Sequence, residues 1–326
     1  MVLPARSLLF VPANRPDRYA KAAAAGADKV IIDLEDSVPA DQRAAAREMI
    51  APALPEVARE RLLVRVNPTA DPEHAADLDA VPLAAVGGLM VPKLEHAAEL
   101  RGLAGELERR EAAAGLAVGS TFLLVLIETA RGVRDANALL EAAAGLGRDC
   151  LVAFGALDYG VEVGIEPAWP LHDSEGDENR RTGIVGQRGV SEQASGVEPE
   201  LLYPRVRLTV AAAAAGLEAP VDSPSTHLRD PERVRAEALA ARRLGFQGKL
   251  CVHPLQVGPC NEVFTPPPTA VAAARAVVDA YDAAQAAGRG AVALDGRMID
   301  MPVVRRAQRT LTLARRLHQG HSAGNA

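Results

Sequence analysis

Residues 122–128 read Phe-Leu-Leu-Val-Leu-Ile-Glu, an unbroken apolar run that ends in a carboxylate. An apolar run of this length, without alternating polar residues, is typical of a strand covered on both faces, as the strands of parallel sheets are. A stretch rich in Ala, Leu and Arg with helical periodicity follows it. This part of the sequence therefore predicts a buried parallel strand followed by a helix.

The same unit recurs along the chain. Seven other short apolar runs, each leading to a polar turn and then a stretch with helical periodicity, lie at residues 7–11, 29–33, 62–66, 87–91, 150–154, 219–222 and 248–252. Eight such units predict an α/β fold, a (β/α)8 TIM barrel. A doubly wound open sheet is the alternative, but its dinucleotide fingerprint is missing. The nearest match, Gly145-Leu-Gly147, precedes a strand and is predicted to end a helix.

The barrel does not account for the whole chain. We expect it to occupy residues 1–265, and a C-terminal helical extension, or lid, to occupy residues 266–326. Three consecutive prolines, residues 266–268, separate the two, and helical patterns follow at residues 269–287 and 303–317. Residues 171–199 are polar and Gly-rich without periodicity, which predicts a long loop after the sixth strand.

Composition narrows the class of protein. The 326 residues carry 36 Lys and Arg against 42 Asp and Glu, a formal net charge of −6, which argues against a general nucleic-acid-binding protein. Cys150, Cys251 and Cys260 are too far apart for a disulfide framework or a zinc site. Every apolar run is too short for a signal peptide or a membrane span. We therefore expect a cytoplasmic protein with no nucleic-acid or membrane partner.

Polar side chains follow nearly every predicted strand. In a TIM barrel the chemistry lies at the carboxyl ends of the strands, so these side chains are expected to converge on one rim. They are Asn14, Asp33, Glu35, Asp36, Arg65, Asn67, Lys93, Glu128, Asp158, Asp222, Ser223 and His253.

Glu128 is the most informative of them, because it directly continues a buried strand. A carboxylate buried there without a partner would lose several kcal/mol or take up a proton, so it requires a cation. The next strand supplies Asp158, and two carboxylates with room for waters and substrate oxygens suit Mg²⁺. In the alternative, Glu128 pairs with Arg131 or Arg65, and Asp158 caps a turn.

Arg65 lies inside an apolar strand, so its guanidinium group must meet an anion. It either forms a structural ion pair with a neighbouring acid or clamps a substrate carboxylate, and the sequence leaves both open. We expect structural roles for at least two of Asp33, Glu35 and Asp36. We also expect His253, which precedes Pro254 at a helix start, to be structural.

Seven motifs in order along the chain resemble one known family. They are Arg6-Ser-Leu-Leu-Phe-Val-Pro-Ala-Asn14, Ile32-Asp-Leu-Glu-Asp-Ser-Val-Pro39, Arg65-Val-Asn67, Val91-Pro-Lys93, Ile127-Glu-Thr-Ala-Arg-Gly132, Phe154-Gly-Ala-Leu-Asp-Tyr159 and Gly248-Lys-Leu-Cys-Val-His-Pro254. As a set they are similar to the citrate lyase beta-subunit-like family of the HpcH/HpaI aldolase superfamily, which includes malyl-CoA and citramalyl-CoA lyases. The resemblance runs from about residue 6 to residue 310 and implies a Mg²⁺-dependent barrel enzyme.

The resemblance also implies roles for individual residues. Glu128 and Asp158 match the metal ligands, and Arg65 matches the arginine that contacts the substrate acid. Asp300, in Asp295-Gly-Arg-Met-Ile-Asp-Met-Pro302, matches the acid of a C-terminal lid that reaches the active site of a neighbouring subunit as the general base. We therefore expect a homotrimer or hexamer with the lid acting in trans. Asp300 is also well placed to be the N-cap of the last helix.

Coenzyme A needs cations at the barrel mouth. Arg15, Arg18 and Lys21 on the first predicted helix are candidates for contacting its phosphates, and a solvated helix face shared with Asp17 is the alternative.

The function implied is a carbon–carbon lyase. It would cleave, or form, a 3-hydroxyacyl-CoA thioester such as malyl-, citramalyl- or citryl-CoA, giving acetyl-CoA and a 2-keto acid. A thioesterase acting on the same substrates is an alternative. So are a citrate lyase beta-type subunit that acts on an acyl-carrier-protein thioester, and an aldolase that uses no coenzyme A. The sequence does not determine the acyl group, because a pocket distinguishes one methyl group by only about 1 to 3 kcal/mol.

Overall fold

The computed structural model describes residues 5–165, 198–286, 292–294 and 297–323. It divides into two compact units, Met1–Glu262 and Val263–Ala326. The loop predicted at residues 171–199 lies outside the described residues except for its last two positions.

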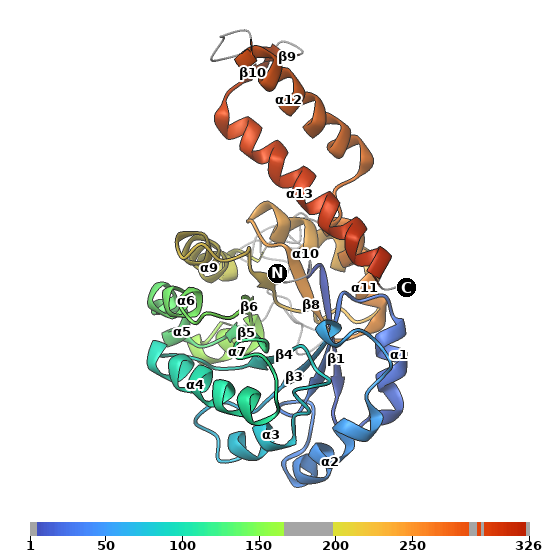
Figure 1. Cartoon of the computed structure of the whole chain (residues 1–326), viewed down its shortest axis with the longest axis vertical. Helices are drawn as coiled ribbons and strands as arrows, with labels where there is room; N and C mark the ends of the chain where they lie inside the picture. The colour runs from blue at the N-terminus through green and yellow to red at the C-terminus, as the bar shows by residue number, and fades with distance from the viewer. Residues whose placement is uncertain (1–4, 166–197, 287–291, 295–296, 324–326) are drawn as a thin grey trace, which may run out of the picture. The chain divides into compact units, whose positions relative to one another are not determined.

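The first unit is a closed barrel of eight parallel strands in sequential order, with β8 pairing with β1 (Figure 1). This confirms the predicted TIM barrel and excludes the open sheet. The strands are β1 (Ser7–Pro12), β2 (Lys29–Asp33), β3 (Leu62–Arg65), β4 (Gly88–Val91), β5 (Phe122–Ile127), β6 (Cys150–Phe154), β7 (Val221–Asp222) and β8 (Gly248–Cys251). Each lies within two residues of the apolar run that predicted it.

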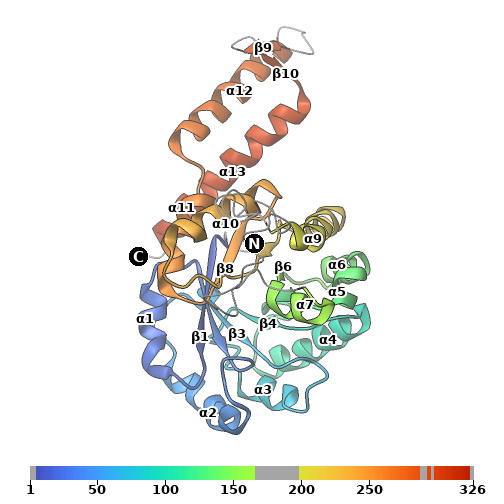
Figure 2. The ribbon, with the colours of Figure 1, turned by 180° about the vertical axis from the view of Figure 1, so that it is seen from behind.

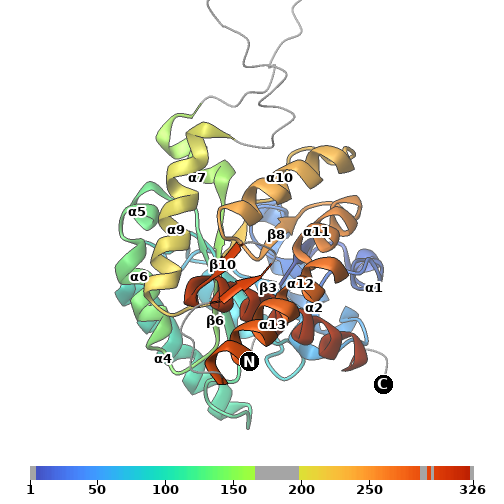
Figure 3. The same ribbon diagram turned by 90° about the horizontal axis from the view of Figure 1, so that it is seen from above.

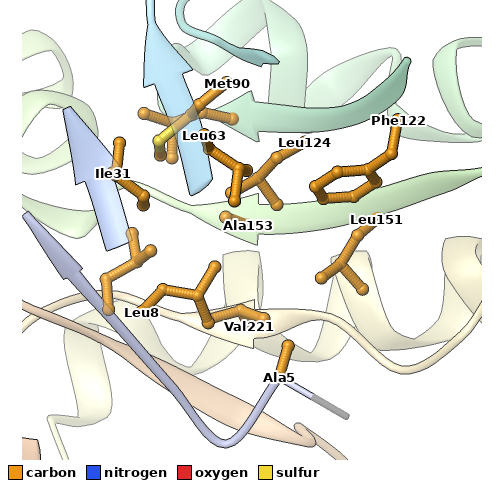
Figure 4. Packing of buried hydrophobic residues seen from close by; sticks show 12 residues of the cluster. Ala5, Leu8, Ile31, Leu63, Met90, Phe122, Leu124, Leu151, Ala153 and Val221 are labelled. Atoms are coloured by element: carbon orange, nitrogen blue, oxygen red, sulfur yellow. The ribbon is translucent and has the colours of Figure 1, made fainter. Parts of the chain in front are cut away.

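Apolar side chains from every strand fill the barrel interior. Figure 4 shows side chains of this cluster pointing toward one another, among them Ile31, Leu63, Leu124 and Phe122. Phe122 lies against Gly88 of the adjacent strand, where a Cβ atom would come within 2.3 Å of the ring. A glycine on one strand thus makes room for one of the few aromatic rings in this chain.

Strand alternation carries the polar residues to the rim. Successive side chains point to opposite faces of a strand, so the residue two positions after a core residue faces the interior again, one layer higher. Ile31 of the core is followed in this way by Asp33, Leu63 by Arg65, and Leu126 by Glu128. The rim is therefore the next layer of the same barrel interior.

Helices surround the barrel, and α4, α6 and α9 lie side by side on its outside (Figures 1 and 3). The helices of this unit are α1 (Tyr19–Ala24), α2 (Arg43–Ala53), α3 (His74–Ala80), α4 (Ala97–Ala113), α5 (Ala130–Arg134), α6 (Ala136–Ala144), α7 (Ala156–Val163), α9 (Leu202–Ala214), α10 (Pro231–Arg243) and α11 (Val257–Phe264), which continues into the second unit. Among the described residues, no helix combines the length and apolarity that crossing a membrane requires.

The second unit is a pair of helices with a small hairpin between them (Figure 2). The chain runs through α12 (Pro268–Ala286), β9 (Val292–Leu294), β10 (Arg297–Ile299) and α13 (Met301–Ala323). Buried Ala274, Ala307 and Leu311 form the contact between the two helices. Both helices of the predicted C-terminal extension are thus confirmed.

Candidate active site

Arg65 is held by Asp33 on the adjacent strand. The register of β2 and β3 places the two residues opposite each other. The Nε and Nη2 atoms of Arg65 donate to the two carboxylate oxygens of Asp33 at 2.6 and 2.7 Å. The guanidinium group also lies over the Phe10 ring, 4.9 Å from its centroid. Of the two roles left open by the sequence, the ion pair is present, and it fixes the orientation of Arg65.

Asp33 also organises the turn after its own strand. Its carboxylate accepts hydrogen bonds from the backbone N–H groups of Glu35 and Ser37 at 3.0 and 3.1 Å. Burial opposes ionisation of this group, but the Arg65 charge and these hydrogen bonds outweigh it and lower the pKa of Asp33 below its usual value. Asp33 is thus structural, as expected for at least two acids of this group.

Glu35 joins two cations at the rim. One carboxylate oxygen lies 2.8 Å from Nη1 of Arg65, and the other accepts a hydrogen bond from Nζ of Lys93 at 2.7 Å. Burial raises the pKa of Glu35, although Arg65 and Lys93 oppose the rise. Asp36 is half-exposed and contacts Arg65 at 3.3 Å. Arg65 therefore contacts Asp33 through its Nε and Nη2 atoms, and Glu35 and Asp36 through its Nη1 atom.

Glu128 is different, because it is buried and has no hydrogen-bond or ion-pair partner among the residues that the structure describes. Its side chain is 2% exposed, and its Oε1 atom makes no hydrogen bond within the part of the chain that the structure describes. Arg131, one of the two cations considered as its partner, pairs with Glu95 at 3.2 Å, and Arg65 is held as above. Burial, and then the charges of Asp158 and Glu35, raise the pKa of Glu128 well above its usual value. The charges of Arg65 and Lys93 oppose this rise, but within the described residues neither forms an ion pair with Glu128.

The next strand is shaped to fit the Glu128 side chain. Gly155 follows β6, and a Cβ atom there would lie 2.4 Å from Oε2 of Glu128. Only glycine leaves this space. The motif Phe154-Gly-Ala-Leu-Asp contains this glycine. The reason that a glycine is needed there is seen only in the structure, where β6 lies beside β5, the strand that leads to Glu128.

Asp158 lies in the first turn of α7 and is partly exposed. Gly155 is the N-cap of that helix and provides no side-chain hydrogen bond. The helix start is instead fixed by the Ser223 hydroxyl, which accepts from the N–H of Ala156 at 3.0 Å. Because the charge of Asp158 contributes to the raised pKa of Glu128, the two acids predicted to act together are close in space.

The donor set fits one kind of metal site. Among the described residues, no three His, Cys, Asp or Glu side chains are grouped closely enough to hold a metal by themselves. This excludes a closed structural zinc site there. Mg²⁺ needs only one or two protein carboxylates, with waters and substrate oxygens as its other ligands. The unpartnered Oε1 of Glu128 and the nearby Asp158 match that requirement.

Other residues singled out from the sequence have structural partners. His253 is the N-cap of a short helix, and its Nδ1 atom accepts from the N–H of Leu255 at 3.2 Å, as expected. Asp222 pairs with Arg205 and Lys249, each at 2.9 Å, on the face of the strand opposite the core residue Val221. It therefore belongs to the barrel wall and not to the rim.

Arg15 and Asp300 show the structural alternative. At the surface, Arg15 pairs with Asp17 at 2.7 Å, as a solvated helix face would. Asp300 caps α13, because its Oδ1 atom accepts from the N–H of Val303 at 3.3 Å. Binding of coenzyme A by Arg15, Arg18 and Lys21, and catalysis by Asp300, stay predictions.

Comparison with known proteins identifies the group to which the chain is related. The model of one family, HpcH/HpaI aldolase/citrate lyase, matches residues 6–172. The chain belongs to this family. Its membership confirms the resemblance carried by the motifs, and with it the expectation of a lyase.

Similar proteins cover nearly the whole length of this lyase. A citrate lyase subunit beta-like protein from Deinococcus radiodurans is 35% identical, over 94% of this chain and 96% of the relative. An L-malyl-CoA/beta-methylmalyl-CoA lyase from Cereibacter sphaeroides is 33% identical, over 94% and 93%. The crystal structure of CitE from Mycobacterium tuberculosis, in complex with magnesium, acetoacetate and coenzyme A, is 29% identical with a TM-score of 0.68, over 96% and 99%.

Replacing the unpartnered acid of this lyase tests the description of its site. We predict that Glu128→Gln raises the free energy of unfolding of the metal-free protein by ~1 kcal/mol or more at pH 7.5, because the amide is not charged. Because the pKa of Glu128 is raised in the folded state, folded Glu128 keeps its proton in a pH range where Glu128 of the unfolded chain has already lost it. Stability of the wild type should therefore fall as pH rises from about 4.3 toward the folded-state pKa, and this fall should be smaller in the variant.

Urea unfolding in the presence of a chelator, at several pH values, measures both effects. Glu141→Gln is the matched control, since Glu141 is exposed on α6 and its replacement should change stability by less than about 0.5 kcal/mol. A lower stability for Glu128→Gln than for the wild type would mean that Glu128 has a stabilising partner, contrary to the structure.

Proposed function

We propose that the chain is a Mg²⁺-dependent lyase that cleaves, or forms, a 3-hydroxyacyl-CoA thioester such as malyl-, citramalyl- or citryl-CoA. The products of cleavage are acetyl-CoA and a 2-keto acid. The observation that carries this proposal is the buried carboxylate of Glu128, which lies beside Asp158 and has no partner in the described part of the chain. Two relatives support the proposal: one is named an L-malyl-CoA/beta-methylmalyl-CoA lyase, and the other was crystallised with magnesium and coenzyme A.

Glu128 and Asp158 would hold the Mg²⁺ ion. When bound there, the ion supplies positive charge for the carboxylate and the adjacent oxygen of the substrate. Arg65, locked by Asp33, offers its remaining N–H groups to the same end of the substrate. Because Arg65 is already oriented before substrate arrives, it stabilises negative charge without reorganising.

The reaction needs a general base in addition. In the cleavage direction, the base removes the proton of the 3-hydroxyl group, the C2–C3 bond breaks, and its electron pair passes to the thioester as an enolate. The hydroxyl carbon becomes the keto group, and protonation of the enolate carbon gives acetyl-CoA. We assign the base to Asp300 of a neighbouring subunit, in a homotrimer or hexamer.

A product assay tests this function. We expect the purified chain to release a 2-keto acid and acetyl-CoA from at least one of malyl-, citramalyl- and citryl-CoA, only in the presence of Mg²⁺. Glu128→Ala should abolish the release, because it removes a proposed metal ligand. Keto acid and acetyl-CoA are measured separately from free coenzyme A.

Each other outcome points to a different function. Free coenzyme A without keto acid would indicate a thioesterase. Activity that appears only when the thioester is on an acyl carrier protein and partner subunits are present would indicate a citrate lyase beta-type subunit. Cleavage of a free hydroxy-keto acid would indicate an aldolase that uses no coenzyme A. Absence of keto acid from all three thioesters under all conditions would contradict the proposed lyase.

Asp300 can be tested without disturbing its cap. Asn and Asp are equally good N-caps, so Asp300→Asn should leave the unfolding midpoint unchanged. Since Asn cannot accept the proton, we predict a loss of about 10²- to 10⁴-fold in kcat. Steady-state kinetics and thermal unfolding of the same preparation measure the two quantities.

Mixed assemblies test whether Asp300 acts in trans. Asp300→Asn and Glu128→Gln chains, each inactive alone, should regain activity when they are dissociated and reassembled together, because some sites then combine an intact barrel with an intact lid. No recovery from mixed assemblies would contradict action in trans, and an unchanged kcat for Asp300→Asn would contradict the base assignment.

A further inference from the structure

Lys93 has an unusual backbone conformation. With φ of 55° it is in the left-handed region, and no other non-glycine residue among those the structure describes has a positive φ. This conformation brings the Cβ atom of an L-residue close to its own backbone and costs free energy, which glycine avoids. A lysine is retained here despite that cost.

The backbone around Lys93 is held in place from outside. Lys93 directly follows Pro92 at the end of β4, and the carbonyl oxygen of Leu94 lies against Gly132 of α5, where a Cβ atom would be only 2.9 Å away. The close approach of the two segments fixes the path of the chain after the strand. Strained residues of this kind persist only where their surroundings determine them, and they concentrate at functional sites.

The strained backbone directs the Lys93 side chain onto Glu35. Its Nζ atom lies 2.7 Å from Oε1 of Glu35 and 3.9 Å from Asp36, while the other oxygen of Glu35 lies 2.8 Å from Nη1 of Arg65. Each oxygen of the Glu35 carboxylate therefore contacts a cation, Lys93 on one side and Arg65 on the other. Asp33 binds the Nε and Nη2 atoms of Arg65, and Glu35 lies at Nη1, so the two acids together fix the guanidinium group and leave N–H groups on Nη1 and Nη2 for a substrate.

A purely stabilising role does not account for this arrangement. The Glu35 side chain is only 3% exposed, but Arg65, 2.8 Å away, already gives its carboxylate one cation. The Lys93 side chain is 32% exposed, so solvent screens the second cation and reduces what it adds to folding. Such a weak contribution does not offset a left-handed lysine, for which asparagine or glycine would be the favoured residue. The benefit must lie in what the ammonium group does at the rim.

We propose that Lys93 is a positioning residue, which holds the Glu35 carboxylate against Arg65 and so keeps the guanidinium group aimed at the substrate. The strained backbone at residue 93 is kept for this purpose, at the expense of stability. The proposal rests on the proposed function in one respect, since its kinetic arm needs a substrate that the wild-type chain cleaves.

Three substitutions separate charge from backbone strain. Lys93→Asn and Lys93→Gly remove the ammonium group and accept the left-handed conformation, whereas Lys93→Arg keeps a cation and the strain. Glu35→Gln, alone and combined with Lys93→Asn, tests whether Lys93 acts through Glu35. Thermal unfolding of the metal-free proteins and steady-state kinetics with Mg²⁺ are measured for each variant.

The expected pattern is a loss of activity without a loss of stability. Lys93→Asn should unfold at the wild-type midpoint or up to ~3 °C above it, yet lose about 10- to 100-fold in kcat. Lys93→Gly should follow the same kinetic pattern, and Lys93→Arg should stay within about threefold of the wild-type kcat because its cation still reaches Glu35. Lys93→Asn should add nothing to the kinetic loss of Glu35→Gln, because residues that act as a unit are not additive.

Three results would overturn the proposal. One is a wild-type kcat in Lys93→Asn and Lys93→Gly; another is a fall in the unfolding midpoint of Lys93→Asn, which would make the ion pair structural. The third is full additivity with Glu35→Gln. If the wild-type chain cleaves none of the three thioesters, the proposed function fails, and the midpoint of Lys93→Asn still decides whether residue 93 is kept at a cost in stability.

Discussion

The structure depends on one electrostatic constraint: a carboxylate is carried into the top layer of a barrel core, where none of the described residues forms an ion pair with it. Strand alternation makes this unavoidable, because Glu128 faces the same interior as Leu126 below it. Gly155 gives the side chain its space, and the nearby Asp158 adds a second negative charge. A buried, unneutralised acid is costly to the fold, so its presence is explained by a positive ligand that binds there during function.

The acids of the rim fall into two groups with different partners. Asp33 and Glu35 are neutralised by cations of the chain itself, and in return they fix Arg65 in one orientation. Glu128 has no such partner within the described residues, and Asp158 lies beside it in the first turn of α7. The first group can orient a substrate carboxylate through Arg65, whereas the second can bind a divalent ion. The chemistry of a lyase needs both, since charge develops on the substrate as its carbon–carbon bond breaks.

The sequence predicted the barrel and the position of Glu128, because both follow from local pattern: eight apolar runs, and an acid at the end of one. It left the role of Arg65 open, since its partner Asp33 lies on another strand and only the register of β2 and β3 pairs them. The left-handed backbone of Lys93 could not be read from residue type, because lysine is not a residue that favours it and the cause is the approach of α5. For Asp300 the capping geometry is visible, while the proposed catalytic role depends on an assembly that a single chain does not contain.

Calorimetric titration of the metal-free protein with Mg²⁺ near pH 6, in two buffers of different ionisation enthalpy, tests whether Glu128 gives up a proton when it binds the ion. Because an ordinary glutamate is already ionised at that pH, a proton released on binding identifies an acid whose pKa is raised, as that of Glu128 is. The wild type should bind Mg²⁺ and release protons, and Glu128→Gln should bind it at least ~10-fold more weakly without release. Equal binding by the two proteins, with no proton released by either, would mean that Glu128 is not a ligand of the ion.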